Sequence, residues 1–229
     1  MKNYLYFDLE TKKTSKDFQD GWGHSIPHFD GSGTTLSESN IFWMEMGVAA
    51  TFDNHALRFW DSPVELLEYL VSDAVDHIVT FNGEGFDFNV LLAAIEPPQV
   101  SQAGYAFSDG YKQFYSILKG KSIDLLAIIN STLGHRVSLG NILQAMFDKG
   151  KVADGAMWWP MWNSQDPAQR MLAVNYLMDD VVQLRKVHGV AAELGQLAYM
   201  DKFNQLQVFN IKVDPIVLDR NPGDIDRPY

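Results

Sequence analysis

Residues 4–11, with the sequence YLYFDLET, end an apolar stretch with two carboxylates, Asp8 and Glu10, separated by one leucine. The stretch from Tyr4 to Leu9 is short, rich in aromatic residues and almost without polar ones, which is typical of a buried strand. On a strand, side chains two positions apart point to the same side, about 6.6 Å from each other. We therefore expect Asp8 and Glu10 to share one face of the strand, while Leu9 packs into the core on the other.

This pair of acids needs a physical explanation, because neighbouring carboxylates repel each other and burying them costs roughly several kcal/mol. A divalent cation removes the conflict, since hard ions such as Mg²⁺ prefer carboxylate oxygens. The alternative is a strand end with two solvated acids, and this pair by itself favours that alternative. Further acids placed beside the pair would favour the cation.

A third acid lies in VTFNGEGFDFNVLL, residues 79–92. A strand over residues 77–81, a loop with two glycines and a helix over residues 86–95 place Asp87 near the first helical turn. The helix macrodipole also favours an acid at this position, so helix capping is the alternative explanation for Asp87.

A fourth acid lies in NYLMDDVVQL, residues 175–184, where helical periodicity separates two neighbouring aspartates. Asp180 lies beside an apolar stripe, and Tyr176 lies one turn before it on the same side. Asp179 instead aligns with polar residues, which predicts a solvent-exposed role. An acid beside an apolar stripe needs a partner, either a Lys or Arg elsewhere in the chain or a metal ion. The stripe consists of Val174, Leu177, Val181 and Leu184.

The rest of the chain alternates strands and helices, which predicts one α/β domain over residues 1–229. Residues 12–40 are polar and form either a functional flap, with Trp22, His24, His28 and Phe29 over a substrate end, or a disordered segment. The other expected elements are a hairpin over residues 42–60, helices that begin after Ser62 and Ser138, a strand running into a helix over 122–130, a loop over 149–167, a helix over 167–200 that breaks near Gly189, and an extended tail from Asn210.

Composition limits the classes of function. Without cysteine, the protein has neither disulfides nor thiolate metal sites, and no apolar run approaches the roughly 20 residues of a membrane helix. The start carries neither a secretion signal nor a transit peptide, so we expect a cytoplasmic protein without a membrane partner. The net charge of −11 argues against broad attraction to nucleic acid, so a phosphate-bearing substrate must meet a local basic patch or bound cations.

Three motifs in order carry a family resemblance: FDLET at 7–11, FNGEGFDF at 81–88 and YLMDDV at 176–181. They resemble the exonuclease motifs of the DEDD superfamily of 3′–5′ exonucleases, which have a ribonuclease H-like fold. The middle motif resembles the proofreading domains of family-B DNA polymerases and their stand-alone relatives. The tyrosine of the third motif is similar to that of the DEDDy branch. The resemblance implies an α/β fold of three layers, with a central mixed sheet flanked by helices.

The resemblance also implies roles for the acids. Asp8, Glu10, Asp87 and Asp180 would hold two Mg²⁺ or Mn²⁺ ions, and Tyr176 would help to orient the attacking water. Candidate substrate contacts are Thr11, Asn82 and Phe86. A strand end also explains Thr11, a turn explains Asn82 equally well, and core packing is the favoured explanation for Phe86. Trp158, Trp159 and Trp162 either stack on unpaired bases or pack onto the core.

The leading functional hypothesis is a metal-dependent 3′–5′ exonuclease that hydrolyses DNA or RNA, with a single-stranded 3′ end as its expected partner. An endonuclease of the same fold is the second hypothesis, and a blocked 3′ end separates the two, because it stops only an exonuclease. A non-catalytic nucleic-acid-binding or scaffolding module is the third. The retention of four acids and the tyrosine argues against it, because a binding module has no use for such a costly site.

Overall fold

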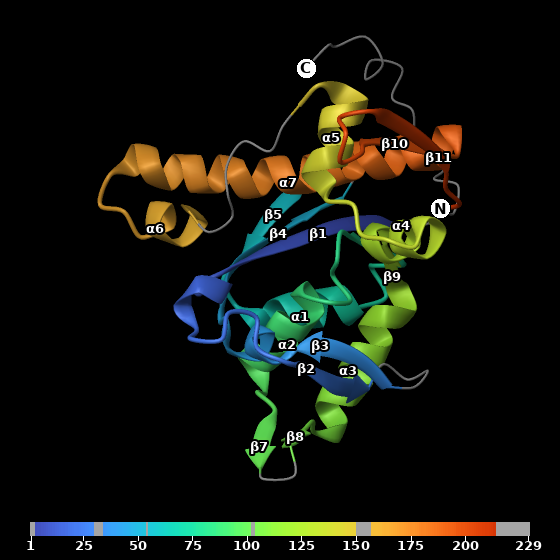
Figure 1. Ribbon diagram of the computed structural model, residues 1–229. Helices are drawn as coiled ribbons and strands as arrows, with labels where there is room; N and C mark the ends of the chain where they lie inside the picture. The colour runs from blue at the N-terminus through green and yellow to red at the C-terminus, as the bar shows by residue number, and fades with distance from the viewer. Residues whose placement is uncertain (1–2, 30–33, 54, 102–103, 150–156, 214–229) are drawn as a thin grey trace.

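A mixed sheet of five strands forms the centre of the fold in the computed structural model, which describes residues 3–29, 34–53, 55–101, 104–149 and 157–213 (Figure 1). The strand order is β5 (Leu57–Trp60), β4 (Met46–Phe52), β1 (Tyr4–Thr11), β6 (His77–Thr80) and β9 (Ser122–Asp124). The central strand β1 is antiparallel to β4 and parallel to β6, while β4 is antiparallel to β5 and β6 is parallel to β9.

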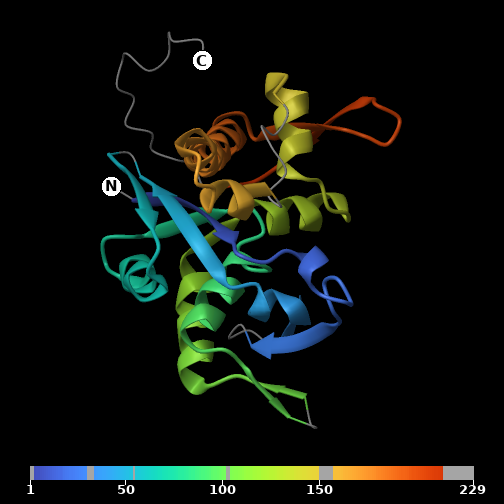
Figure 2. The ribbon, with the colours of Figure 1, turned by 90° about the vertical axis from the view of Figure 1, so that its left-hand side faces the viewer.

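Helices cover both faces of this sheet, and each face has its own hydrophobic core. One layer consists of α1 (Pro63–Val71), α2 (Asp87–Ile95) and α3 (Asp109–Lys121). The other consists of α4 (Leu125–Leu133), α5 (Leu139–Phe147), α6 (Trp158–Trp162) and α7 (Pro167–Leu194). Figure 2 shows the two layers on opposite sides of β1 and β4, with α7 packed across the sheet. The predicted three-layer α/β fold is confirmed.

The alternation of side chains along β1 decides which face carries the acids. Phe7 and Leu9 belong to the core beneath α1–α3, whereas Tyr6 belongs to the core beneath α7. Asp8 and Glu10 follow Tyr6 by two and four positions, and side chains at this spacing share one face of a strand. Both carboxylates therefore lie on the α7 side of the sheet, at the end of β1.

Most predicted elements lie where the sequence places them. The strands β4 and β5 form the predicted hairpin, and β6 and β9 are the predicted strands. Ser62 caps α1 and Ser138 caps α5, each by accepting a hydrogen bond from a backbone N–H group. The hairpin begins only at Met46, because residues from Ser39 to Trp43 form the 3-10 helix η2.

The helix α7 differs from its prediction at both Gly189 and its end. It runs unbroken through Gly189 to Leu194, so the predicted break is wrong; a single glycine costs a helix only about 1 kcal/mol, and buried Val187 and Ala191 anchor the turns around it. Gly195, with a φ of +63°, ends the helix. Instead of further helix, β10 (Gln196–Met200) pairs with β11 (Leu206–Asn210). Within the described residues, no helix is both long and apolar enough to cross a lipid bilayer.

The polar segment after β1 contains defined elements. It forms the 3-10 helix η1 (Ser15–Asp17) and a hairpin of β2 (Ser25–Phe29) and β3 (Thr34–Glu38). In the stretch from 99 that the sequence leaves unassigned, β7 (Gln99–Ser101) and β8 (Gly104–Ala106) form a second small hairpin before α3. Part of the predicted 12–40 flap, part of the 149–167 loop and most of the tail after Asn210 lie outside the described residues.

The tryptophans of the predicted loop belong to α6 and pack onto the core. Trp158 is fully buried and donates its indole N–H to the backbone oxygen of Ala173 at 3.0 Å. The ring of Trp162 stacks on that of Trp158, with 5.4 Å between the centroids. Trp159 and Trp162 are partly buried and also pack against this core, as the packing explanation predicts.

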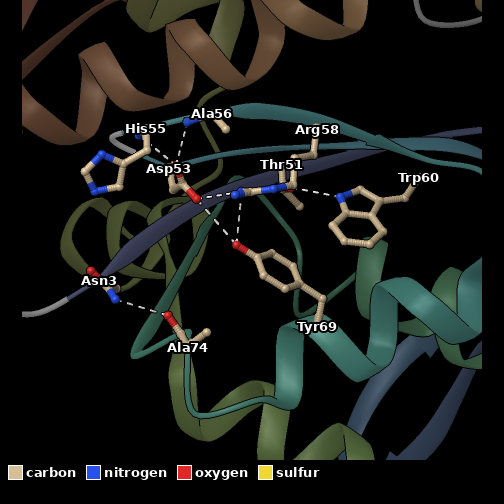
Figure 3. Close-up of polar contacts among 9 residues, drawn as sticks. All are labelled: Asn3, Thr51, Asp53, His55, Ala56, Arg58, Trp60, Tyr69 and Ala74. Atoms are coloured by element: carbon tan, nitrogen blue, oxygen red, sulfur yellow. Dashed lines mark hydrogen bonds and ion pairs between the residues drawn. The ribbon is translucent and has the colours of Figure 1, made fainter.

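A polar network fixes the far end of the β4–β5 hairpin against α1 (Figure 3). One oxygen of Asp53 accepts the backbone N–H groups of His55 and Ala56, each at 2.7 Å. The other accepts from the guanidinium of Arg58 at 2.6 Å and from the hydroxyl of Tyr69 at 3.4 Å. Burial acts to raise the pKa of Asp53, but these hydrogen bonds outweigh it and hold the pKa below its ordinary value. The network ties the sheet to the helix layer opposite α7.

His188 is a buried histidine on the inner face of α7. Its Nδ1 lies 3.2 Å from the hydroxyl of Tyr6, and its ring also contacts Tyr4. Its Nε2 is buried without a hydrogen-bond partner among the described residues. Burial, followed by the nearby His77, lowers the pKa of His188 to about 4 from 6.5. The folded protein therefore holds this imidazole neutral.

We expect this histidine to make the protein less stable in acid. The unfolded chain takes up a proton as the pH falls through 6.5, whereas the folded chain does so only near pH 4. Stability is therefore full above pH 6.5 and falls between pH 6.5 and 4, by up to about 3 kcal/mol. Urea unfolding across this range, compared with a His188→Gln variant, measures the difference. Equal losses of stability in the two proteins would show that His188 does not titrate in this way.

Candidate active site

Three carboxylates converge between the end of β1 and the middle of α7. Asp8 and Glu10 come from β1 and Asp180 from α7, and each offers one oxygen such that all three oxygens lie within 4.8 Å of one another. Asp180 is buried, and Glu10 is only 9% exposed. Carboxylate oxygens at this separation suit a hard divalent cation, so the donor set fits the ions that the sequence predicts.

A β-bulge shapes the strand end that carries Glu10. Glu10 pairs with Val48 but Thr11 pairs with Met46, so the register slips by one residue opposite Gly47. A Cβ on Gly47 would lie 2.9 Å from the backbone oxygen of Glu10 and 2.9 Å from the ring of Trp158, which explains the glycine. Bulges of this kind redirect side chains beside functional sites.

Asp87 reaches the same pocket from the opposite helix layer. It lies in the first turn of α2, and its Oδ1 accepts the backbone N–H of Leu9 at 3.3 Å. The pairing of β1 with β6 ends at Tyr6 and Val79, and the chain after β6 leads to the start of α2. Asp87 lines a pocket of about 350 Å³ together with Asp8, Glu10 and Asp180, although it is not one of the three acids within 4.8 Å.

Tyr176 lies one helical turn before Asp180 and lines the same pocket. Burial is the main cause that raises the pKa of its phenol far above 10, and the negative charges of Asp180, Glu10 and Asp8 raise it further. A hydrogen bond from the hydroxyl to Asp180 acts in the same direction. The phenol therefore remains protonated at neutral pH.

The three candidate substrate contacts also line this pocket. The hydroxyl of Thr11 donates to the backbone oxygen of Lys13 at 2.6 Å. Asn82 has a φ of +77°, and Phe86 meets the ring of Trp22 edge to face at 6.2 Å. The structure thus brings all eight predicted site residues to one pocket, while their roles remain predictions.

Asp124, to which the sequence assigns no role, holds the loop that contributes Asn82 to the pocket. It is buried, and its Oδ1 accepts the backbone N–H of Asn82 at 2.9 Å and that of Leu126 at 3.0 Å. Its Oδ2 accepts the backbone N–H of Glu84 at 3.0 Å. Asp124 thereby caps α4 and also holds the loop between β6 and α2. An acid directly before the apolar run LLAII is a signal for a helix N-cap, but the tie to the loop is visible only in three dimensions.

We expect Asp124→Asn to loosen this loop while keeping the helix cap. The amide oxygen can still accept from Asn82 and Leu126, whereas the NH₂ group would face the N–H of Glu84 and lose that bond. The lost bond should cost about 1–3 kcal/mol of stability and raise KM for a nucleic-acid substrate. Urea unfolding and steady-state kinetics measure the two effects. Unchanged values in both would mean that Asp124 is only a helix cap.

Comparison with known proteins agrees with this geometry. The sequence profile of the RNase H superfamily matches residues 5–191. The chain belongs to the RNase H superfamily. This membership supports nuclease activity in general, and it confirms the ribonuclease H-like fold that the three motifs predict. None of the curated proteins matches the chain in sequence.

A solved structure with the same fold is the family B DNA polymerase from the hyperthermophilic archaeon Pyrobaculum calidifontis. The polymerase structure and this RNase H superfamily member superpose with a TM-score of 0.52 at 16% sequence identity, so the two share a fold. The match covers 85% of this chain and 24% of the polymerase chain, so the protein corresponds to about a quarter of that polymerase.

Proposed function

We propose that the protein is a metal-dependent 3′–5′ exonuclease of the tyrosine-bearing DEDD type, acting on single-stranded 3′ ends of DNA or RNA. The convergence of Asp8, Glu10 and Asp180 within 4.8 Å of one another carries the proposal. Asp87 and Tyr176 line the same pocket, which adds the remaining two residues of the motif set. The sheet shared by both helix layers supports one exonuclease-like domain.

Asp8, Glu10, Asp87 and Asp180 would hold two Mg²⁺ or Mn²⁺ ions. When bound, such ions supply a water of lowered pKa and stabilise the charge that develops on the leaving oxygen. The carboxylates would supply the negative charge that holds such ions at the strand end. Holding them there would also offset the net charge of −11 where a phosphate docks.

The side chains around the acids position the substrate. Tyr176 keeps its hydroxyl proton, so it can hydrogen-bond and orient the attacking water beside Asp180. Phe86 offers an aromatic surface to the terminal base, and Thr11 and Asn82 offer polar groups to the terminal nucleotide. Attack on the last phosphodiester bond would release one nucleotide and leave a new 3′ end.

Single-stranded DNA and RNA with a 5′ label test this proposal. With Mg²⁺ or Mn²⁺ we expect a ladder of products that shorten stepwise from the 3′ end, and EDTA should abolish it. A substrate with a blocked 3′ end should stay intact. Internal cuts in the blocked substrate would show an endonuclease instead, and intact substrate under all conditions would contradict nuclease activity.

A further inference from the structure

A second hollow lies beside the carboxylate pocket and shares part of its wall. Its volume is about 330 Å³, and Trp22, Asn82 and Phe86 line both hollows. The acids of the carboxylate pocket do not line the second hollow; instead Arg136 and Glu38 do. The two spaces are therefore neighbours with different charges, separated by the aromatic pair of Trp22 and Phe86.

Trp22 is an exposed aromatic side chain on a rigidly held turn. It is 47% exposed, although an indole normally gains from burial. The side-chain amide of Asn40 donates to the Asp20 carboxylate at 2.7 Å and to the Gly21 oxygen at 2.9 Å, and the Asn40 backbone N–H donates to the Trp22 oxygen at 3.2 Å. Gly21 and Gly23 have φ values of +63° and +76°, a conformation that glycine adopts without strain. The ring is thus presented at the site before any ligand binds.

Arg136 supplies the positive charge of the second hollow. Its Nη2 donates to the side-chain oxygen of Asn82 at 3.1 Å, and its side chain is exposed. A guanidinium has five N–H donors in a planar fork that matches the geometry of a phosphate, and this bond uses one of them. Arg136 is the one basic residue among the described residues that line the hollow, so it is the group there that attracts a phosphate, whereas Trp22 offers its ring to an uncharged base.

We propose that this second hollow binds the penultimate nucleotide of a single-stranded 3′ end, with its base against Trp22 and its phosphate at Arg136. The inference rests on the proposed function, which places the terminal nucleotide in the adjoining carboxylate pocket. A base inside a duplex is stacked between its neighbours, so its face is closed to Trp22. The segment between β1 and β4 thereby selects unpaired ends.

Equilibrium binding of a 5′-fluorescein-labelled oligothymidylate, measured by anisotropy, tests the subsite. All proteins carry Asp180→Asn, so that the oligonucleotide stays intact. Trp22→Ala should weaken binding about tenfold, and Trp22→Tyr should restore most of it, because base stacking on an aromatic ring is lost and regained. Arg136→Ala should weaken binding to a similar degree and reduce its dependence on salt. Lys202→Ala and Phe203→Ala, an exposed cation and aromatic ring in the β10–β11 turn, should have no effect.

An oligonucleotide that lacks only the penultimate base makes the test specific. Without Trp22 substitution, removal of this base should weaken binding about tenfold. With Trp22→Ala, removal of the same base should weaken binding no further, because the two changes delete one contact. The proposal would be overturned if the losses of affinity from Trp22→Ala and from base removal multiplied, or if removal of the base had no effect on binding. The comparison of the two oligonucleotides on the protein that keeps Trp22 remains valid even if the Trp22→Ala variant is poorly folded.

The outcomes separate this subsite from the proposed function. If the two losses of affinity do not multiply but the wild-type protein hydrolyses no substrate, the subsite proposal holds and the exonuclease proposal is wrong. If the wild-type protein hydrolyses the substrate stepwise but the two losses of affinity multiply, the exonuclease proposal holds and the subsite proposal is wrong.

Discussion

Asp8→Asn and Asp180→Asn should each reduce the rate of hydrolysis of single-stranded DNA at least about 10³-fold. Each substitution keeps the shape of the side chain and removes one negative charge from the three carboxylates that converge at the end of β1. Bound ions supply roughly several kcal/mol of charge stabilisation to such reactions, and each 1.36 kcal/mol is a factor of about ten in rate. Single-turnover hydrolysis of a 5′-labelled oligonucleotide measures the loss.

Asp179→Asn is the matched control, because Asp179 neighbours Asp180 on α7 but accepts a hydrogen bond from Gln183 at 3.0 Å. This variant should hydrolyse DNA at the wild-type rate. If all three variants are equally active, the assignment of the acids is wrong. If Asp179→Asn is as inactive as Asp180→Asn, the loss reflects disturbance of α7 and not of the carboxylate cluster.

Tyr176→Phe should lower kcat by about 10- to 100-fold while leaving the affinity for Mn²⁺ unchanged. The phenol stays protonated, so beside the four carboxylates Tyr176 can donate a hydrogen bond to the attacking water or to Asp180. Loss of a hydrogen bond that involves a charged partner costs about 1.5–3 kcal/mol. Steady-state kinetics together with Mn²⁺ titration separates the two quantities.

Tyr69→Phe is the control for this experiment, because Tyr69 lies in the polar network at the far end of the β4–β5 hairpin (Figure 3). It should leave kcat unchanged. A Tyr176→Phe protein that is as fast as the wild type would remove the hydroxyl from the mechanism. One that loses Mn²⁺ would instead give Tyr176 a role in holding the acids.

The sequence predicts the parts of the site that depend on local periodicity. The alternation along β1 places Asp8 and Glu10 on one face, and the 3.6-residue repeat of α7 distinguishes Asp180 from Asp179. The same repeat places Gln183 on the polar face of Asp179, four residues earlier, but the structure buries the Gln183 side chain. These residues are predictable because each side-chain direction follows from its own strand or helix.

Features that depend on contacts between distant segments are not predictable in this way. The glycine at position 47 is explained by Glu10 and Trp158 together, and the hydrogen bond between Asp124 and Asn82 joins the end of β9 to the loop after β6. Trp22 reaches the site through a turn that Asn40 holds from the other end of a polar segment. The β10–β11 hairpin escapes prediction because the helix is expected to reach residue 200, whereas Gly195 ends α7 in a left-handed conformation and β10 begins at the next residue.

An anomalous difference map from crystals grown with Mn²⁺ tests the metal site most directly. We predict peaks in contact with the carboxylate oxygens of Asp8, Glu10 and Asp180 on the side of the pocket that Asp87 lines, and none there in the Asp180→Asn protein. A map without peaks at these carboxylates, while Mn²⁺ supports hydrolysis in solution, would contradict the account.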